Sequence, residues 1–191
     1  MPTLSQSKPT YRFNPWLAAV LLVYSYTLWL MVEITLQYKY LGTGVAFLAI
    51  KQDYISIPYF VPAFYVHVFS AILVLPAGYT QFSSRIRATA PNLHKRMGRL
   101  YVWVTLLLAG PSGLVLGIYA NGGPGSQTAF CLLAVGWMYT TYMAMRSVSR
   151  RQIAAHRAWM MRSFALALSA ITLRAWKYVL VWAFHPRPMD V

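Results

Sequence analysis

The stretches GRLYVWVTLLLAGPSGLVLGIYA at 98–120 and QTAFCLLAVGWMYTTYMAMR at 127–146 are long, apolar and separated only by NGGPGS at 121–126. No Lys, Arg, Asp or Glu lies between Arg99 and Arg146. An α-helix needs about 20 mostly apolar residues to cross a bilayer, so each stretch is long enough to span it. The link is rich in Gly and Pro, which favours a tight reversal. The sequence therefore predicts an antiparallel hairpin of two transmembrane helices.

Three further stretches, at 16–38, 60–82 and 158–184, have the same length and apolar character. Of the 191 residues, 58% are hydrophobic and only 10% charged, whereas soluble domains usually carry about 25% charged residues. The first stretch is too long for the apolar core of a signal peptide, so we interpret it as retained. We expect an all-α integral membrane bundle of about five helices, forming one domain over 1–191.

The positive charge predicts how the bundle is oriented. Seventeen Lys and Arg face three acids, for a net charge of +14, and most of them cluster in two connections. The clusters are Arg85, Arg87, Lys95, Arg96 and Arg99 before or at the third stretch, and Arg146, Arg150, Arg151, Arg157 and Arg162 around the start of the fifth. Basic connections remain on the cytoplasmic side, so we expect the N-terminus inside and the C-terminus outside. Anionic lipid, and not nucleic acid, is the expected counter-charge.

Two histidines lie at this cytoplasmic end. His94 and His156 each stand near the start of a spanning helix and are followed by cations, among them Arg99, Arg157 and Arg162. A helix N-terminus offers free N–H groups and a positive dipole end, which suits an anionic ligand. If the two helices are neighbours, the histidines could ligate one haem iron, because imidazole is a usual axial ligand. The alternatives are bonds to lipid headgroups and the binding of a quinone or another anionic ligand.

A second polar cluster is predicted in the outer leaflet from Glu33, His67, Arg174 and Lys177. Arg174 and Lys177 share a face of the fifth helix, and Glu33 is the only acid at this level of the membrane. Ionisable groups inside a span are costly and are functional candidates by default. One interpretation is a structural ion pair that orients the first helix; the other is a pocket in which His67 ligates or hydrogen-bonds a cofactor.

Small residues predict which helix faces pack together, because they let helix backbones approach closely in lipid. The third helix carries Gly110, Gly113 and Gly117, and the fifth carries Ser163 and Ala167 at helical spacing. The first helix has no comparable stripe, so we expect it to pack outside the others. Motifs of metalloproteases, dithiol redox proteins and phosphate-binding loops are absent from the sequence, and its single cysteine excludes an intramolecular disulfide.

Two motifs carry a resemblance to a known family. They are Leu93-His94-Lys95-Arg96-Met97-Gly98-Arg99 and His156-Arg157-Ala158-Trp159-Met160-Met161-Arg162-Ser163. With His67 before them and Arg174 after them, the chain resembles bacterial multi-pass membrane proteins known only as a domain of unknown function. The resemblance implies a helical bundle in the bacterial inner membrane and no established activity. A weaker resemblance, to dihaem cytochromes of the b561 kind, implies haem ligation, although their two pairs of histidines are not repeated here.

These observations leave three hypotheses for function. The leading one is a membrane redox or cofactor-binding protein that holds a b-type haem or a quinone near the cytoplasmic face through His94 and His156. The second is a non-enzymatic accessory subunit that assembles with other membrane subunits. The third is a small transporter with a polar pocket at His67 and Arg174, which would have to oligomerise to form a pathway.

Overall fold

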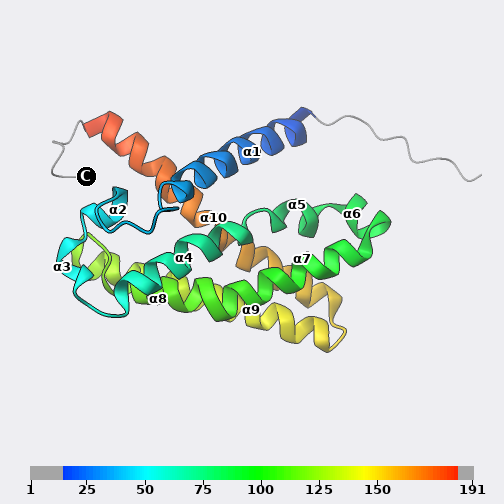
Figure 1. Cartoon of the computed structure of the whole chain (residues 1–191). Helices are drawn as coiled ribbons and strands as arrows, with labels where there is room; N and C mark the ends of the chain where they lie inside the picture. The colour runs from blue at the N-terminus through cyan, green and yellow to red at the C-terminus, as the bar shows by residue number, and fades with distance from the viewer. Residues whose placement is uncertain (1–14, 185–191) are drawn as a thin grey trace, which may run out of the picture.

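The computed structural model describes residues 15–184, apart from the side chains of residues 177 and 178. Over this range the chain is helical without any strand, and five helices are long and apolar enough to cross a membrane (Figure 1). The elements are α1 (Pro15–Leu36), α2 (Ala46–Ala49), α3 (Gln52–Ile55), α4 (Phe60–Val74), α5 (Ala77–Phe82), α6 (Ser84–Thr89), α7 (Pro91–Val104), the π-helix η1 (Thr105–Ala109), α8 (Gly110–Ile118), α9 (Gly123–Ser149) and α10 (Ile153–Phe184). The predicted helical membrane bundle is confirmed.

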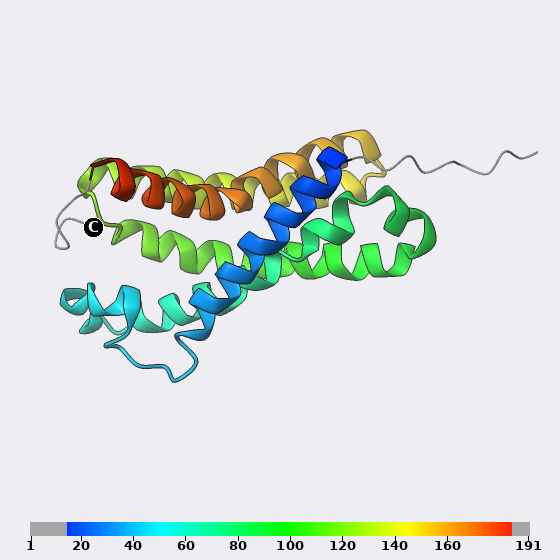
Figure 2. The ribbon, with the colours of Figure 1, turned by 90° about the horizontal axis from the view of Figure 1, so that it is seen from above.

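The five spans are α1, α4 with α5, α7 through α8, α9, and α10. The last four form the bundle, with α9 packed against both α8 and α10, and α4 packed against η1 and α8. Helix α1 lies across the outside of this bundle (Figure 2) and buries only Met31, as expected from its lack of small residues. The turns before α7 and before α10 lie at one end of the bundle, which we call the basic end.

The third and fifth spans begin earlier than the apolar stretches, at Pro91 and Ile153. Pro91 is the first residue of α7, where its missing N–H costs no hydrogen bond. As a result, His94 and His156 both lie in the first turn of their helices. Those first turns are where backbone N–H groups have no partner within the helix.

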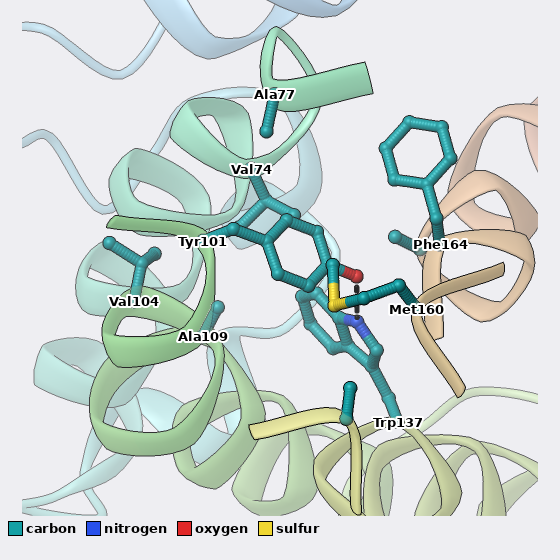
Figure 3. Packing of buried hydrophobic residues seen from close by; sticks show 10 residues of the cluster. Val74, Ala77, Tyr101, Val104, Ala109, Trp137, Met160 and Phe164 are labelled. Carbon is teal, nitrogen blue, oxygen red and sulfur yellow. Dashed lines mark hydrogen bonds between the residues drawn. The ribbon is translucent and has the colours of Figure 1, made fainter. Parts of the chain in front are cut away.

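The core of the bundle lies where α4, α5, α7, α9 and α10 meet (Figure 3). Tyr101 is 1% exposed and lies beside Met160 and Phe164, above the indole of Trp137. A second cluster lies toward the opposite end, where Tyr38, Leu48, Phe60 and Phe64 pack together. The segment between α1 and α4 contributes Tyr38 and Leu48 to this cluster, so it folds over that end of the bundle.

Close helix contact depends on glycine, as predicted. A Cβ on Gly110 would lie 2.4 Å from Met138 Cγ of α9, and a Cβ on Gly117 would lie 3.2 Å from Cys131 Sγ. Pro111 follows directly and cannot donate a backbone hydrogen bond. The helix adjusts with a π-turn before this proline, in which the Gly110 N–H donates to Thr105 O. Turns of this kind are frequent at functional sites.

Candidate functional site

The three histidines of the described chain share one kind of contact, in which Nδ1 faces a backbone carbonyl of a neighbouring element. His67 Nδ1 lies 3.0 Å from Ala109 O, His94 Nδ1 lies 3.3 Å from Thr80 O, and His156 Nδ1 lies 2.9 Å from Ala144 O. A carbonyl oxygen can only accept, so Nδ1 must carry the proton. In the neutral ring Nε2 then holds a lone pair. No described group forms a hydrogen bond with these Nε2 atoms.

A contact between α7 and α10 shows how His94 and His156 are related. Tyr101 Oη and Ser163 Oγ are 2.7 Å apart, and each of these residues lies roughly two helical turns beyond the histidine of its own helix. Two full turns return to the same face, so both histidines lie on the facing sides of α7 and α10, about 10 Å below the contact. Helix geometry thus puts the two histidines at about the same level.

Their hydrogen bonds hold the two rings from different sides. His94 bonds to Thr80 of α5, and His156 bonds to Ala144 of α9. Gln81 Nε2 also donates to His94 O at 3.0 Å, which ties the first turn of α7 to α5. Each histidine therefore belongs to its own helical hairpin, and the packing of α8 against α9 brings the two hairpins together.

A ring of buried hydrogen bonds lies about two helical turns from the histidines, further from the basic end of the bundle. Trp137 Nε1 lies 3.1 Å from Tyr101 Oη, Thr141 Oγ1 lies 2.7 Å from Ser163 Oγ, and Thr141 Oγ1 donates to Trp137 O at 2.8 Å. An indole N–H only donates, a carbonyl only accepts, and each hydroxyl donates once. The Trp137 indole N–H therefore donates to Tyr101 Oη, the Tyr101 hydroxyl to Ser163 Oγ, and the Ser163 hydroxyl to Thr141 Oγ1. The Thr141 hydroxyl closes the ring by donating to the backbone carbonyl of Trp137. Sequence reasoning missed this ring because its members lie on three helices at unrelated spacings.

The basic end carries unneutralised positive charge. Arg99, Arg157 and Arg162 have exposed side chains, and the Arg162 guanidinium lies 4.6 Å from the centre of the Trp159 ring. The two acids of residues 15–184 lie toward the opposite end, so no described carboxylate balances these cations. An anionic group at this end of the bundle would meet an attractive field.

The members of the predicted outer cluster come from three helices. Glu33 lies on α1, His67 on α4 and Arg174 on α10. Glu33 is exposed. Arg174 is exposed as well and donates to Ala170 O of its own helix at 3.2 Å, while the side chain of Lys177 lies outside the described residues. The expected ion pair of Glu33 with Arg174 or Lys177 therefore stays a prediction.

Comparison with known proteins places this chain in a family. It belongs to the DUF2306 family of predicted membrane proteins, and the match covers residues 64–189. All three described histidines lie in the matched range, whereas α1, α2 and α3 lie before it. No curated protein and no solved structure matches the chain. The chain is thus a multi-pass membrane protein from a family of unknown function.

Proposed function

We propose that this protein is a membrane redox protein that holds one b-type haem at its basic end, with His94 and His156 as the axial ligands. The observation that supports the proposal is that a backbone carbonyl orients each histidine through Nδ1, near the starts of two helices that meet at the contact between Tyr101 and Ser163. We also propose that this end faces the cytoplasm of a bacterial cell, because basic connections are retained on that side.

The residues fit a haem better than a bare metal ion. Among the described residues, no group of three or more His, Cys, Asp and Glu side chains lies close enough together to hold a metal. Two histidines suffice for haem because the porphyrin supplies the remaining nitrogen ligands. A ligating histidine almost always donates its other ring N–H to a carbonyl or carboxylate, which fixes the tautomer. The carbonyls of Thr80 and Ala144 serve His94 and His156 in this way.

The charges around the histidines fit the rest of the cofactor. Arg157 is an exposed cation near the start of α10, and Arg99 is an exposed cation further along α7. The N-terminal ends of both helices add positive potential. These groups would hold the two propionates, while Met97 and Met160 would cover the apolar ring edge. When bound, a haem supplies reversible one-electron transfer.

A quinone at this position is a weaker match. Its two carbonyl oxygens need hydrogen-bond donors, whereas both imidazoles present an Nε2 lone pair in their neutral form. An accessory role without any cofactor remains the competing hypothesis, and it predicts a colourless protein that co-purifies with a larger membrane complex.

The visible spectrum of the detergent-purified chain, expressed with ample haem, tests the proposal. We expect a Soret band and sharp reduced α-bands that are lost in His94→Ala and in His156→Ala. His67→Ala is the matched control, because His67 makes the same Nδ1 bond at another level of the bundle, and it should retain the bands. A colourless protein without iron would refute the haem, as would bands that survive both substitutions.

A further inference from the structure

An apolar cavity lies between α1, α5 and α10, in the half of the bundle nearer the basic end. Its volume is about 180 Å³, and α1 lines it with Val20 and Leu21, α5 with Gly78, and α10 with Phe164 and Leu168. Figure 1 shows α1 standing away from α5 and α6 near its start. The cavity therefore lies where the first span separates from the rest of the bundle.

The ring of Phe164 forms the inner wall of this cavity. Its centroid lies 6.4 Å from that of Tyr24 on α1 and 5.0 Å from that of Phe82 on α5. A Cβ on Gly78 would lie 2.5 Å from Phe164 Cζ, so the ring packs against the bare backbone of α5. The three helices thus meet at this ring, whereas Val20 on the other side of the cavity is 63% exposed. The cavity is closed toward the core and open toward the lipid.

No polar group of the lining is free to bind water. Tyr24 Oη donates to Leu75 O, and Tyr79 Oη forms a hydrogen bond with Ser25 Oγ. Water enters a cavity where polar groups offer it two to four hydrogen bonds, so this cavity suits hydrocarbon better. An apolar cavity of about 150 Å³ can hold a benzene molecule. About six carbon atoms of a lipid chain would therefore fit here, and they would restore the dispersion contacts that an empty cavity loses.

A cation lies just outside the membrane end of the cavity. The span made of α4 and α5 ends at Phe82, and Arg87 of α6 folds back so that its Nη1 donates to Gln81 O at 3.2 Å. Gln81 lies about one helical turn beyond Gly78. A guanidinium has five N–H donors, and no other described acceptor bonds this one. Donors at the level of the headgroups suit a phosphate.

We propose that this cavity binds one acyl chain of an anionic phospholipid, and that Arg87 binds the phosphate of the same molecule. A phospholipid presents its chain in the membrane and its charge at the surface, which is the order of the cavity and Arg87. The acids of residues 15–184 lie toward the opposite end, so the basic end attracts an anionic headgroup and repels the cation of a choline headgroup. Neither His94 nor His156 lines the cavity, so the proposal does not depend on the haem.

Native mass spectrometry of the full chain, released from detergent micelles, tests the headgroup. The probes are palmitoyl-oleoyl phosphatidylglycerol and the phosphatidylcholine with the same chains. We expect one phosphatidylglycerol to bind about fivefold more tightly than the phosphatidylcholine, and Arg87→Gln to remove most of this preference. Arg85→Gln is the matched control, because Arg85 is an exposed cation of the same helix whose side chain forms no described hydrogen bond to α5. It should keep the preference.

A second pair of variants tests the cavity. Leu21→Trp places a larger side chain in the cavity, whereas Leu22→Trp makes the same change at a neighbour that does not line it and is 71% exposed. We expect Leu21→Trp to lose the tightly bound phosphatidylglycerol and Leu22→Trp to bind it as the wild type does. Because Leu21→Trp could displace α1, the exposed Arg87 provides an independent variant.

The outcomes decide between a specific lipid site and ordinary contact with the bilayer. One bound phosphatidylglycerol that depends on both Leu21 and Arg87 supports the proposal. Equal affinity for the two lipids, or wild-type preference in Arg87→Gln, would overturn it. Equal binding in Leu21→Trp and Leu22→Trp would also overturn it, because the chain would then lie elsewhere. These measurements leave the haem bands as a separate test of the proposed function.

Discussion

If the hydrogen bonds among Trp137, Tyr101, Ser163 and Thr141 form a closed ring, the losses in stability caused by substitutions in the ring should not be additive. Each of three substitutions leaves one buried donor without an acceptor. Tyr101→Phe removes the acceptor of the Trp137 N–H, and Ser163→Ala removes the acceptor of the Tyr101 O–H. Thr141→Val removes the acceptor of the Ser163 O–H. A buried unsatisfied donor costs about 1–3 kcal/mol. Interhelical hydrogen bonds in membranes average about 0.6 kcal/mol, so we expect about 1–2 kcal/mol for each single variant.

The triple variant should cost no more than one single variant. With all three hydroxyls removed, the only orphaned donor is the Trp137 N–H, as in Tyr101→Phe alone. Three independent bonds would instead give the sum, about 3–6 kcal/mol. The free energy of unfolding measured in bicelles by steric trapping can separate these values.

A matched control keeps the test specific to the ring. Ser169→Ala makes the same change on the same helix, but Ser169 Oγ donates only to Leu166 O of its own helix at 2.6 Å. This variant should stay within about 0.5 kcal/mol of wild type. Additive losses in the triple variant, or a loss in Ser169→Ala as large as that in Ser163→Ala, would refute the closed ring.

Three further predictions concern packing, orientation and pH. Gly110→Ala should destabilise the bundle by about 1–3 kcal/mol because its Cβ would meet Met138 at 2.4 Å, whereas Gly125→Ala, with nothing within 4 Å, should be neutral by thermal unfolding. A reporter fused after Gly123 should be active on the outer side, and cytoplasmic activity would reverse the proposed orientation. Burial lowers the pKa of Lys51 below 10.5, so the unfolded chain binds more protons between the two pKa values and stability should rise with pH across that window. Lys51→Met should remove this rise, and a slope unchanged in the variant would contradict it.

The sequence predicted most of the architecture because lipid imposes simple requirements. Length and hydropathy located the five spans, and the stripe from Ser163 to Ala167 marked an inward face that is buried in the structure. The depth of His94 and His156 followed from counting residues along two parallel helices. These features depend only on helix geometry and on which residues tolerate hydrocarbon.

Features that depend on contacts between distant residues could not be predicted. Nothing in the local sequence indicates that Tyr101 and Trp137 share a hydrogen bond, because that bond depends on how α7 meets α9. The surroundings of Glu33 have the same limit. The sequence places one acid and two cations at one depth, but it does not show how α1 crosses the outside of the bundle, where Glu33 is exposed. The depth of a residue in the membrane can therefore be predicted from sequence, whereas the rotation of a helix about its axis and the angle at which helices cross cannot.

The closed ring also bears on how the two ends of the bundle communicate. Its level lies between His94 and His156 at one end and His67 at the other, and each of its hydroxyl protons is already donated within the ring. Proton transfer through a hydrogen-bonded chain requires a donor that can pass its proton onward, and a ring that returns to the Trp137 carbonyl has no onward acceptor. The four residues of the ring therefore offer a proton no onward path between the two ends of the bundle.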